Sequence, residues 1–246
     1  MLESLEGEPR GARIGGVVIG VVTNNKDESK WGRVKVKLPT GGEESDWAWV
    51  AVPMTGKEMG TYLLPEVGDR VVVAFISGDI NYPVIIGSLW DEKNPPPACN
   101  DDGKNNVRMI KSRSGHQIIF DDNAEGKKEK VEIRTKSGHT ILLDDASGAE
   151  KIEIKDKTGK NMLFLNSANN EVLLASQGKI TIKDGQGSTV EMSPGKVAVA
   201  SKGELQISGQ SKVAIKAQII EIEAGATMTV KSSGPMTIQG AIVKIN

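Results

Sequence analysis

Two histidines and two pairs of aspartates are the side chains of this sequence that invite a catalytic or metal-binding interpretation. His116 and His139 each follow a Ser-Gly pair and precede an apolar run, so they occupy equivalent positions of a repeat. Imidazole binds metals and moves protons near neutral pH. Because both histidines come directly after turn residues, we interpret them as corner residues of a repeated structure.

The pairs Asp121-Asp122 and Asp144-Asp145 have the composition of a glycoside hydrolase site, in which two carboxylates lie about 5–10 Å apart. Adjacent residues of a strand point to opposite faces, so a dipeptide aims its two carboxylates away from each other. Both pairs also end an apolar run just before turn residues. We therefore interpret them as strand-end and turn residues.

The remaining motifs supply no catalytic constellation. Cys99 is the single cysteine and excludes a disulfide within the chain and a cysteine-based zinc site. Gly15-Gly16 and Gly41-Gly42 match neither a phosphate-binding loop nor a dinucleotide fingerprint. We predict a protein that is not an enzyme and has no catalytic residues, metal or cofactor. The alternative is a β-solenoid enzyme that degrades polysaccharide, like a tailspike, which needs a carboxylate cluster in an outer groove.

The charge of the chain also narrows the functional class. Its 31 basic and 32 acidic residues leave a net charge of -1, which gives no reason to expect a nucleic-acid partner. No apolar stretch approaches the ~20 residues of a membrane span. The acidic N-terminus is unlike a signal peptide, so we expect synthesis in the cytoplasm without an export signal.

The first part of the chain predicts a compact all-β domain over residues 14–90, after an N-terminal extension over residues 1–13. Five apolar or alternating runs separated by turn residues suit a small Greek-key barrel of the OB type. OB-folds that bind oligonucleotides use a basic groove with exposed aromatic rings. Trp47 and Trp49 alternate within an apolar run, so we expect at least one of them to face the core and do not predict oligonucleotide binding. The predicted strands are Ile14–Val22, Gly32–Leu38, Asp46–Val52, Arg70–Ile76 and Val84–Leu89.

Beyond a Pro-rich linker over residues 91–106, the sequence repeats itself. Ser114–Asp122 recurs as Ser137–Asp145, and a fainter copy follows at Thr158–Asn166. Between the copies, Lys130–Arg134 matches Lys151–Lys155, so each unit predicts two strands joined by turns. These longer repeats extend over residues 107–183.

Residues 184–246 change to a shorter repeat. Each repeat contains two apolar residues separated by one residue, and the repeat recurs every seven or eight residues. Burying one such side chain contributes about 1.5–3 kcal/mol, whereas ordering the backbone costs about 1–2 kcal/mol per residue. We therefore predict three intertwined chains that form a triangular prism, with each strand edge paired to another chain. The predicted trimer core is Val199, Ile207, Ile215, Ile222, Val230, Ile238 and Ile245.

The order of motifs resembles the central spike proteins of contractile injection machines, namely phage baseplate assembly protein V and the VgrG spikes of type VI secretion. The resemblance implies an all-β homotrimer, with an N-terminal OB-fold barrel followed by an intertwined triple-stranded β-helix over residues 107–246. It covers residues 14–246. The motifs that carry it are Gly32–Pro39, Trp47–Pro53, Leu64–Phe75, Gly78-Asp79, Tyr82–Leu89, the Ser-Gly-His copies and the terminal ladder.

The same resemblance implies a structural role. Such a spike caps the tube and hub of a phage tail-like or secretion particle and pierces the target envelope when the sheath contracts. Only about a dozen residues precede the OB motifs, so we expect a separate hub protein. Some spikes hold an iron ion through a terminal His-x-His pair, but here His116 and His139 lie far from the C-terminus. We expect a PAAR-like tip protein to dock on Val243, Lys244, Ile245 and Asn246.

Overall fold

The computed structural model describes residues 14–39, 42 and 44–245, and the chain divides into two compact units, Met1–Gln177 and Gly178–Asn246. The predicted extension over residues 1–13 and Asn246 of the predicted tip site lie outside the described residues. The regular secondary structure of the described part consists of β-strands and two short 3-10 turns, so the predicted all-β class is confirmed. Within that part, no helix is long and apolar enough to span a membrane.

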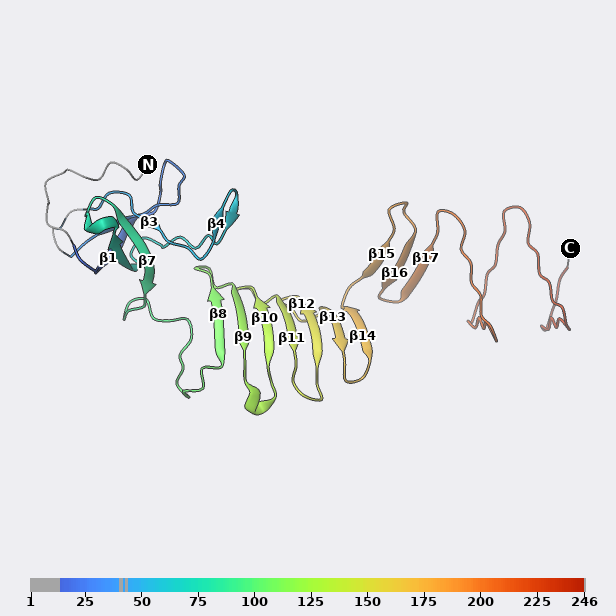
Figure 1. The fold of residues 1–246 in the computed structure, drawn as a ribbon. Helices are drawn as coiled ribbons and strands as arrows, with labels where there is room; N and C mark the ends of the chain where they lie inside the picture. Colours follow the sequence, from blue (N-terminus) through green and yellow to red (C-terminus); the bar gives the residue numbers. More distant parts are fainter. Residues whose placement is uncertain (1–13, 40–41, 43, 246) are drawn as a thin grey trace. The chain divides into compact units, whose positions relative to one another are not determined.

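The N-terminal domain is a curled five-stranded sheet with the order β2-β1-β6-β7-β3 (Figure 1). β1 pairs antiparallel with β2 and β6, β6 pairs antiparallel with β7, and β3 runs parallel to β7. This arrangement fits the predicted OB-fold. The strands are β1 (Val17–Asn24), β2 (Lys35–Lys37), β3 (Trp49–Val50), β6 (Arg70–Phe75) and β7 (Pro83–Leu89).

The core of this domain lies on the inner face of the curled sheet. Gly20 of β1 faces this core, where a Cβ atom would lie 3.3 Å from Val73 Cγ2 and 3.4 Å from the Lys37 carbonyl oxygen. Glycine therefore permits the close approach of β1 to its neighbours. The buried apolar residues are Val22, Val34, Val36, Leu38, Ala48, Val71, Val73, Phe75 and Ile85.

A small hairpin, which the sequence analysis did not predict, lies between β3 and β6 in the chain. It consists of β4 (Thr55–Gly56) and β5 (Met59–Gly60). Gly60 has a φ of 145°, and a Cβ atom there would lie 2.6 Å from the Met54 carbonyl oxygen, so the turn requires glycine. Two-residue strands are too short to show a period of two, and this is why the pattern missed them.

The second sheet of the first unit contains seven strands in sequence order, each antiparallel to the next (Figure 1). Its β10 and β12 have the predicted bounds. The longer repeats predicted strands joined by turns, and these strands pair within one chain because turns of a few residues return the backbone directly. The strands are β8 (Val107–Lys111), β9 (Gln117–Asp121), β10 (Lys130–Arg134), β11 (Thr140–Asp144), β12 (Lys151–Lys155), β13 (Asn161–Asn166) and β14 (Glu171–Ser176).

The second unit begins with a three-stranded antiparallel sheet, β15 (Ile180–Lys183), β16 (Thr189–Ser193) and β17 (Lys196–Ala200). From residue 201 to residue 245 the chain forms no strand, although its sequence alternates like one. The predicted rungs in this segment are therefore absent as strands from a single chain. Backbone groups form a strand only with a hydrogen-bonded partner, and this segment has no such ladder within its own chain.

Candidate trimerisation face

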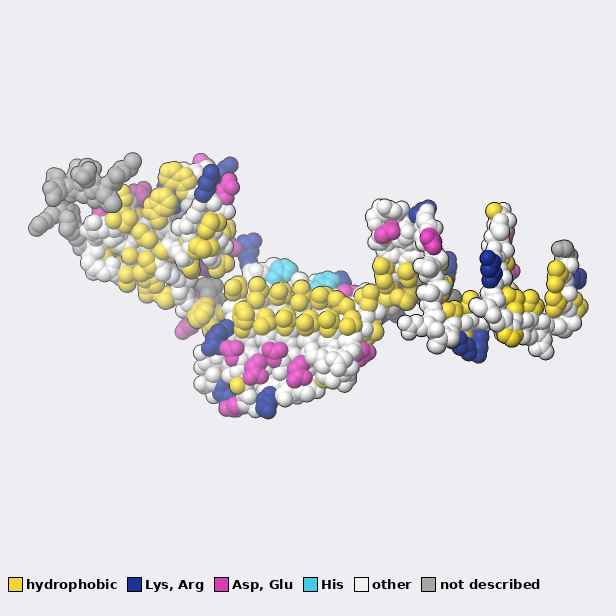
Figure 2. Space-filling model, turned by 45° about the vertical axis from the view of Figure 1, so that its right-hand side comes forward, with side chains coloured by type: hydrophobic (Ala, Val, Ile, Leu, Met, Phe, Trp, Pro, Cys, Tyr) yellow, Lys and Arg dark blue, Asp and Glu magenta, His cyan; other side chains and the backbone are white. Residues whose placement is uncertain are grey.

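One face of the seven-stranded sheet carries two unbroken rows of apolar side chains (Figure 2). Alternate residues of a strand point to the same face, and the observed register aligns them from strand to strand. We call this surface the shaft face. Its first row is Ile110, Ile118, Ile133, Ile141, Ile154, Leu163 and Leu174, and its second row is Arg108, Phe120, Val131, Leu143, Ile152, Leu165 and Val172.

The shaft face is uncovered in a single chain. Ile118 is 38% exposed, Phe120 is 45% exposed and Val172 is 72% exposed. Arg108 is the one charged member of the rows, and it lies on the first strand, where it forms an ion pair with Asp122. Contiguous apolar patches on monomers rarely exceed a few hundred Å², so a surface that extends over seven strands is a candidate interface.

The three-stranded sheet of the second unit repeats the same pattern. Its register aligns Ile180 with Met192 and Val197, and Ile182 with Val190 and Val199. Val199, the first residue of the predicted trimer core, is 53% exposed in one chain. Strand pairing therefore produces the same two-row surface in both units.

The structure does not bring the other predicted core residues together in a sheet. They lie in the segment without strands and are exposed, from 67% at Ile215 to 88% at Ile245. At the predicted tip site, Val243 is 50% exposed, and Asn246 lies outside the described residues. The inward orientation of the core residues and the docking role of the tip stay predictions.

The opposite face of the seven-stranded sheet is mixed, because two largely polar rows flank a middle row in which Glu132 and Glu153 stand among apolar residues. The apolar members of this middle row are Met109, Ile119, Leu142, Phe164 and Leu173. Glu132 is buried, and its Oε1 accepts a hydrogen bond from Arg134 Nε at 2.8 Å. Along one edge, Lys130 stands in register with Asp121 and with Asp144, so the charges alternate from strand to strand. Opposite charges across strands stabilise a pairing, and a slip by one residue would invert the two faces. The charges therefore reinforce the register that produces the apolar rows.

The two histidines lie at the corners of the repeat, as predicted. His116 Nδ1 accepts a hydrogen bond from the backbone N–H of Lys136 at 3.3 Å, and His139 Nδ1 accepts one from Lys157 at 3.2 Å. Each histidine thus links its own turn to the equivalent turn of the next repeat. Within the described residues, no group of three or more His, Cys, Asp or Glu side chains is placed to hold a metal ion.

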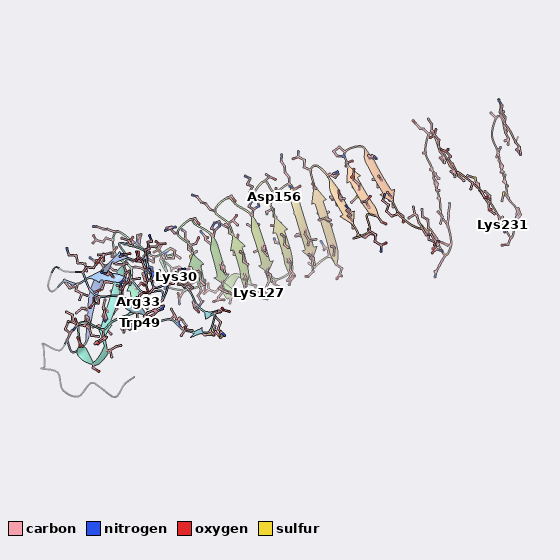
Figure 3. The ribbon with its side chains drawn as sticks, turned by 90° about the horizontal axis from the view of Figure 1, so that it is seen from above. Lys30, Arg33, Trp49, Lys127, Asp156 and Lys231 are labelled. Atoms are coloured by element: carbon pink, nitrogen blue, oxygen red, sulfur yellow. The ribbon has the colours of Figure 1, made fainter. Side chains whose placement is uncertain are left out.

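The acidic residues at the strand ends also have the predicted turn and edge roles. Asp144 ends β11, and its Oδ1 accepts a hydrogen bond from the backbone N–H of Ala146 at 3.0 Å. In the third repeat, Asp156 occupies the turn before β13 (Figure 3). Burial raises the pKa of Asp156, but hydrogen bonds from Thr158, Asn161 and Lys160 outweigh it and lower the pKa to about 2. Its charged carboxylate therefore holds the turn together.

A cluster of aromatic and basic side chains lies on the N-terminal domain (Figure 3). The Arg33 guanidinium donates two hydrogen bonds to Asp27, at 2.9 and 3.1 Å, and lies 4.7 Å from the centre of the Trp31 ring. The Trp31 and Trp49 rings stack with their centres 5.8 Å apart. Beside them, a hollow of about 740 Å³ extends to the β4–β5 hairpin. The cluster fixes the orientation of two exposed tryptophans, a relation between distant residues that the sequence pattern did not predict.

The Asp27–Arg33 pair makes the N-terminal domain sensitive to acid. The hydrogen bond from Arg33 lowers the pKa of Asp27 from 3.8 to about 2. A lowered pKa means that the charged form stabilises the folded state, so this contribution is present above about pH 4 and is lost as the pH falls to about 2. We expect Asp27→Asn to lower stability at neutral pH and to flatten the pH dependence in this window.

Tryptophan fluorescence during urea unfolding measures this effect, because all four tryptophans lie within the first 90 residues. The exposed Asp46 provides the matched control. Asp46→Asn should lose as much stability as the wild type when the pH is lowered. In Asp27→Asn, a smaller loss of stability at low pH should remain. Its source is Glu44, whose pKa is lowered by the Thr23 hydroxyl and Lys35. Equal pH profiles for the wild type and Asp27→Asn would contradict the role of the pair.

Comparison with known families identifies both sheets. Residues 18–90 match the injector OB domain of type VI secretion systems and phage baseplates. Residues 130–205, which include most of the shaft face, match the phage baseplate V C-terminal trimerisation domain. The chain belongs to the baseplate V and VgrG-like spike family. The trimerisation match supports a homotrimer for this spike protein. The shaft face is the candidate surface for contact between the three copies.

Curated relatives of the spike protein bear names that agree with this family. It is 32% identical over 111 residues to the type VI secretion system spike protein VgrG2a of Pseudomonas aeruginosa, which is 41% of this chain and 13% of the relative. It is 29% identical over 126 residues to the spike protein VgrG3 of Vibrio cholerae, 46% of this chain and 12% of the relative. The actin cross-linking toxin VgrG1 of Vibrio cholerae is 28% identical over 126 residues, and again 12% of its length is matched. The matched stretch is thus a small part of each relative.

Proposed function

We propose that this chain is the structural central spike of a contractile injection machine, and that it acts as a homotrimer. The observation that carries the proposal is the shaft face, whose two apolar rows extend over seven strands and are uncovered in one chain. Three such faces turned toward one axis form a closed prism that buries all of them. The opposite faces, which carry the ion pair between the buried Glu132 and the exposed Arg134, then lie on the outside of the prism.

The mechanism is transmission of force along the prism. Neighbouring strands lie ~4.8 Å apart, and their backbone hydrogen bonds run along the direction of stacking. A load along the shaft therefore acts on the whole hydrogen-bond ladder and not on individual side chains. When the sheath contracts, the shaft pushes its tip against the target envelope without requiring catalysis.

The partners follow from the two ends of this arrangement. The OB domains form a collar that contacts a separate hub protein and the tail tube. The C-terminal end, with Val243, Lys244, Ile245 and Asn246, seats a separate PAAR-like tip protein. The proposal for this end rests on the predicted last rung, Val243 to Ile245, which alternates like the rungs before it.

The proposal is tested by mass and by location. The purified chain should sediment with three times its mass of 26.3 kDa. In contractile particles from the source cells, an antibody against the chain should label the baseplate end, and cells without the gene should release particles that deliver nothing. A monomeric chain, or fully active particles that lack it, would overturn the assignment.

A further inference from the structure

The sheet of the OB domain is apolar on both of its faces. The inner face contains the core, but β1, β6 and β7 also place apolar residues on the outer face, where Val17 is 57% exposed and Ile19 is 50% exposed. Strands that are apolar on both faces are typical of sheets covered on both sides. We call this surface the outer OB face, and it consists of Val17, Ile19, Val21, Val72, Ala74, Val84 and Ile86.

The outer OB face continues across the sheet from β1 through β6 and β7 to β3. Val17 stands in register with Ala74, Ala74 with Val84, and Val84 with Trp49 of β3. Among the described residues in register with these positions, two are charged, and both stand beside Val21 at one end of the surface. Arg70 Nε lies 3.0 Å from Asp91 Oδ2, and Lys37 belongs to the edge strand β2. A continuous apolar surface of this kind is suited to a protein contact and not to an ionic ligand.

The same domain exposes a second apolar surface on the β4–β5 hairpin and the residues that flank it. Met54 is 51% exposed, Met59 60%, Tyr62 78% and Leu63 65%. Contacts around a three-fold axis are heterologous, which means that each subunit offers one surface and receives a different one. The hairpin and the outer OB face are two different apolar surfaces on one domain, as a three-fold contact requires.

We propose that, in the trimer, the β4–β5 hairpin of one protomer packs on the outer OB face of the next, which closes a ring of three OB domains. This inference rests on the trimeric spike of the proposed function. The linker over residues 91–106 spans at most about 55 Å, so the joined shafts keep the three OB domains close together. Tethering over such distances gives effective concentrations in the millimolar range, at which apolar surfaces of this size associate.

The N-terminal residues of the same chain are a poorer cover for this face. Residues 1–13 include three glutamates and two arginines and only a few apolar side chains. Burying their charges against an apolar surface would cost free energy. A second copy of the chain brings four exposed apolar side chains on and beside its hairpin, with two charges, Lys57 and Glu58, at the turn. It therefore matches the outer OB face better than residues 1–13.

Disulfide cross-linking in the full-length trimer tests the contact. Ile19→Cys and Met59→Cys are combined in a Cys99→Ser background, which removes the exposed native thiol. Because each chain carries one thiol of each kind, oxidation should give covalent dimers and closed covalent trimers on a denaturing gel. The matched control replaces Ile19→Cys by a cysteine at the exposed Glu28, and it should stay monomeric on the gel.

Methionine oxidation in the protein without cysteine changes gives an independent measurement. Met54 and Met59 should oxidise at least about five-fold more slowly in the trimer than in a chain kept monomeric by Ile118→Asp. Met109, which lies on the sheet face opposite the shaft face, serves as the internal reference. Equal rates, or no covalent dimer in a chain that sediments as a trimer, would overturn the contact and leave the spike function intact. Slower oxidation that disappears when residues 2–13 are deleted would assign the cover to the N-terminus and also overturn it. A chain that sediments as a monomer would overturn both proposals.

Discussion

An Ile118→Asp chain is expected to fold its OB domain and to remain monomeric at concentrations at which the unaltered chain is a trimer. Ile118 lies in the first row of the shaft face, between Ile110 and Ile133. Assembly would bury three unpaired carboxylates, each at a cost of several kcal/mol, so the total penalty is on the order of 10 kcal/mol or more. Sedimentation measures the loss of the trimer, and tryptophan fluorescence verifies the OB domain.

The neighbouring residue provides a matched control for this substitution. Gln117 points to the opposite face of the same strand, where it stands in register with Lys111 and Arg134. Gln117→Asp introduces the same charge one position away, beside two cations, and should leave the trimer intact. Dissociation of both variants, or of neither, would show that the shaft face is not the trimer interface.

An Ile215→Asp chain is expected to lose assembly through the terminal ladder. In the predicted prism, three carboxylates meet at the axis, whereas the side chain is 67% exposed in a single chain. Residues 201–245 form no strand alone, so they should become accessible to protease once the contacts between chains are lost. Limited trypsin digestion, followed by mass spectrometry, should shorten the variant to about Ala200 and leave the unaltered trimer whole.

Ala214 supplies the corresponding control in the ladder. It stands between the two apolar residues of the same rung and is predicted to point outward. Ala214→Asp should therefore retain the protease resistance and the trimeric mass. A soluble, protease-resistant trimer of Ile215→Asp would refute the predicted packing of the ladder.

Local alternation predicted a large part of the fold. The bounds of β10 and β12 agree residue by residue, because each is a five-residue alternation flanked by turn residues. The predicted β1 began at Ile14, but the strand begins at Val17, after Gly15 and Gly16. Where a run begins with glycine, pairing with neighbouring strands decides the residue at which the strand begins. The local pattern does not contain this information.

The sites that involve distant residues could not be predicted in the same way. The Asp27–Arg33 pair depends on a turn that brings the two side chains together, and Trp31 reaches Trp49 only through the folded domain. The two rows of the shaft face need the strand register, which the sequence specified only in part through its alternating charges. The outer OB face could have been recognised from the uninterrupted apolar character of Val17–Val22, since half of such a strand must point away from the core.

The change at Ala200 from strands paired within one chain to a segment without strands has a consequence for biogenesis. The sheets before this point can form on each nascent chain by itself, whereas the ladder after it requires three chains already in register. We therefore expect pairing between the three chains to begin at the sheets and to proceed toward the C-terminus, so that the last rungs become ordered last. Synthesis of the chain and formation of the ladder would then be separate events, because the ladder forms only after the sheets of three chains have joined.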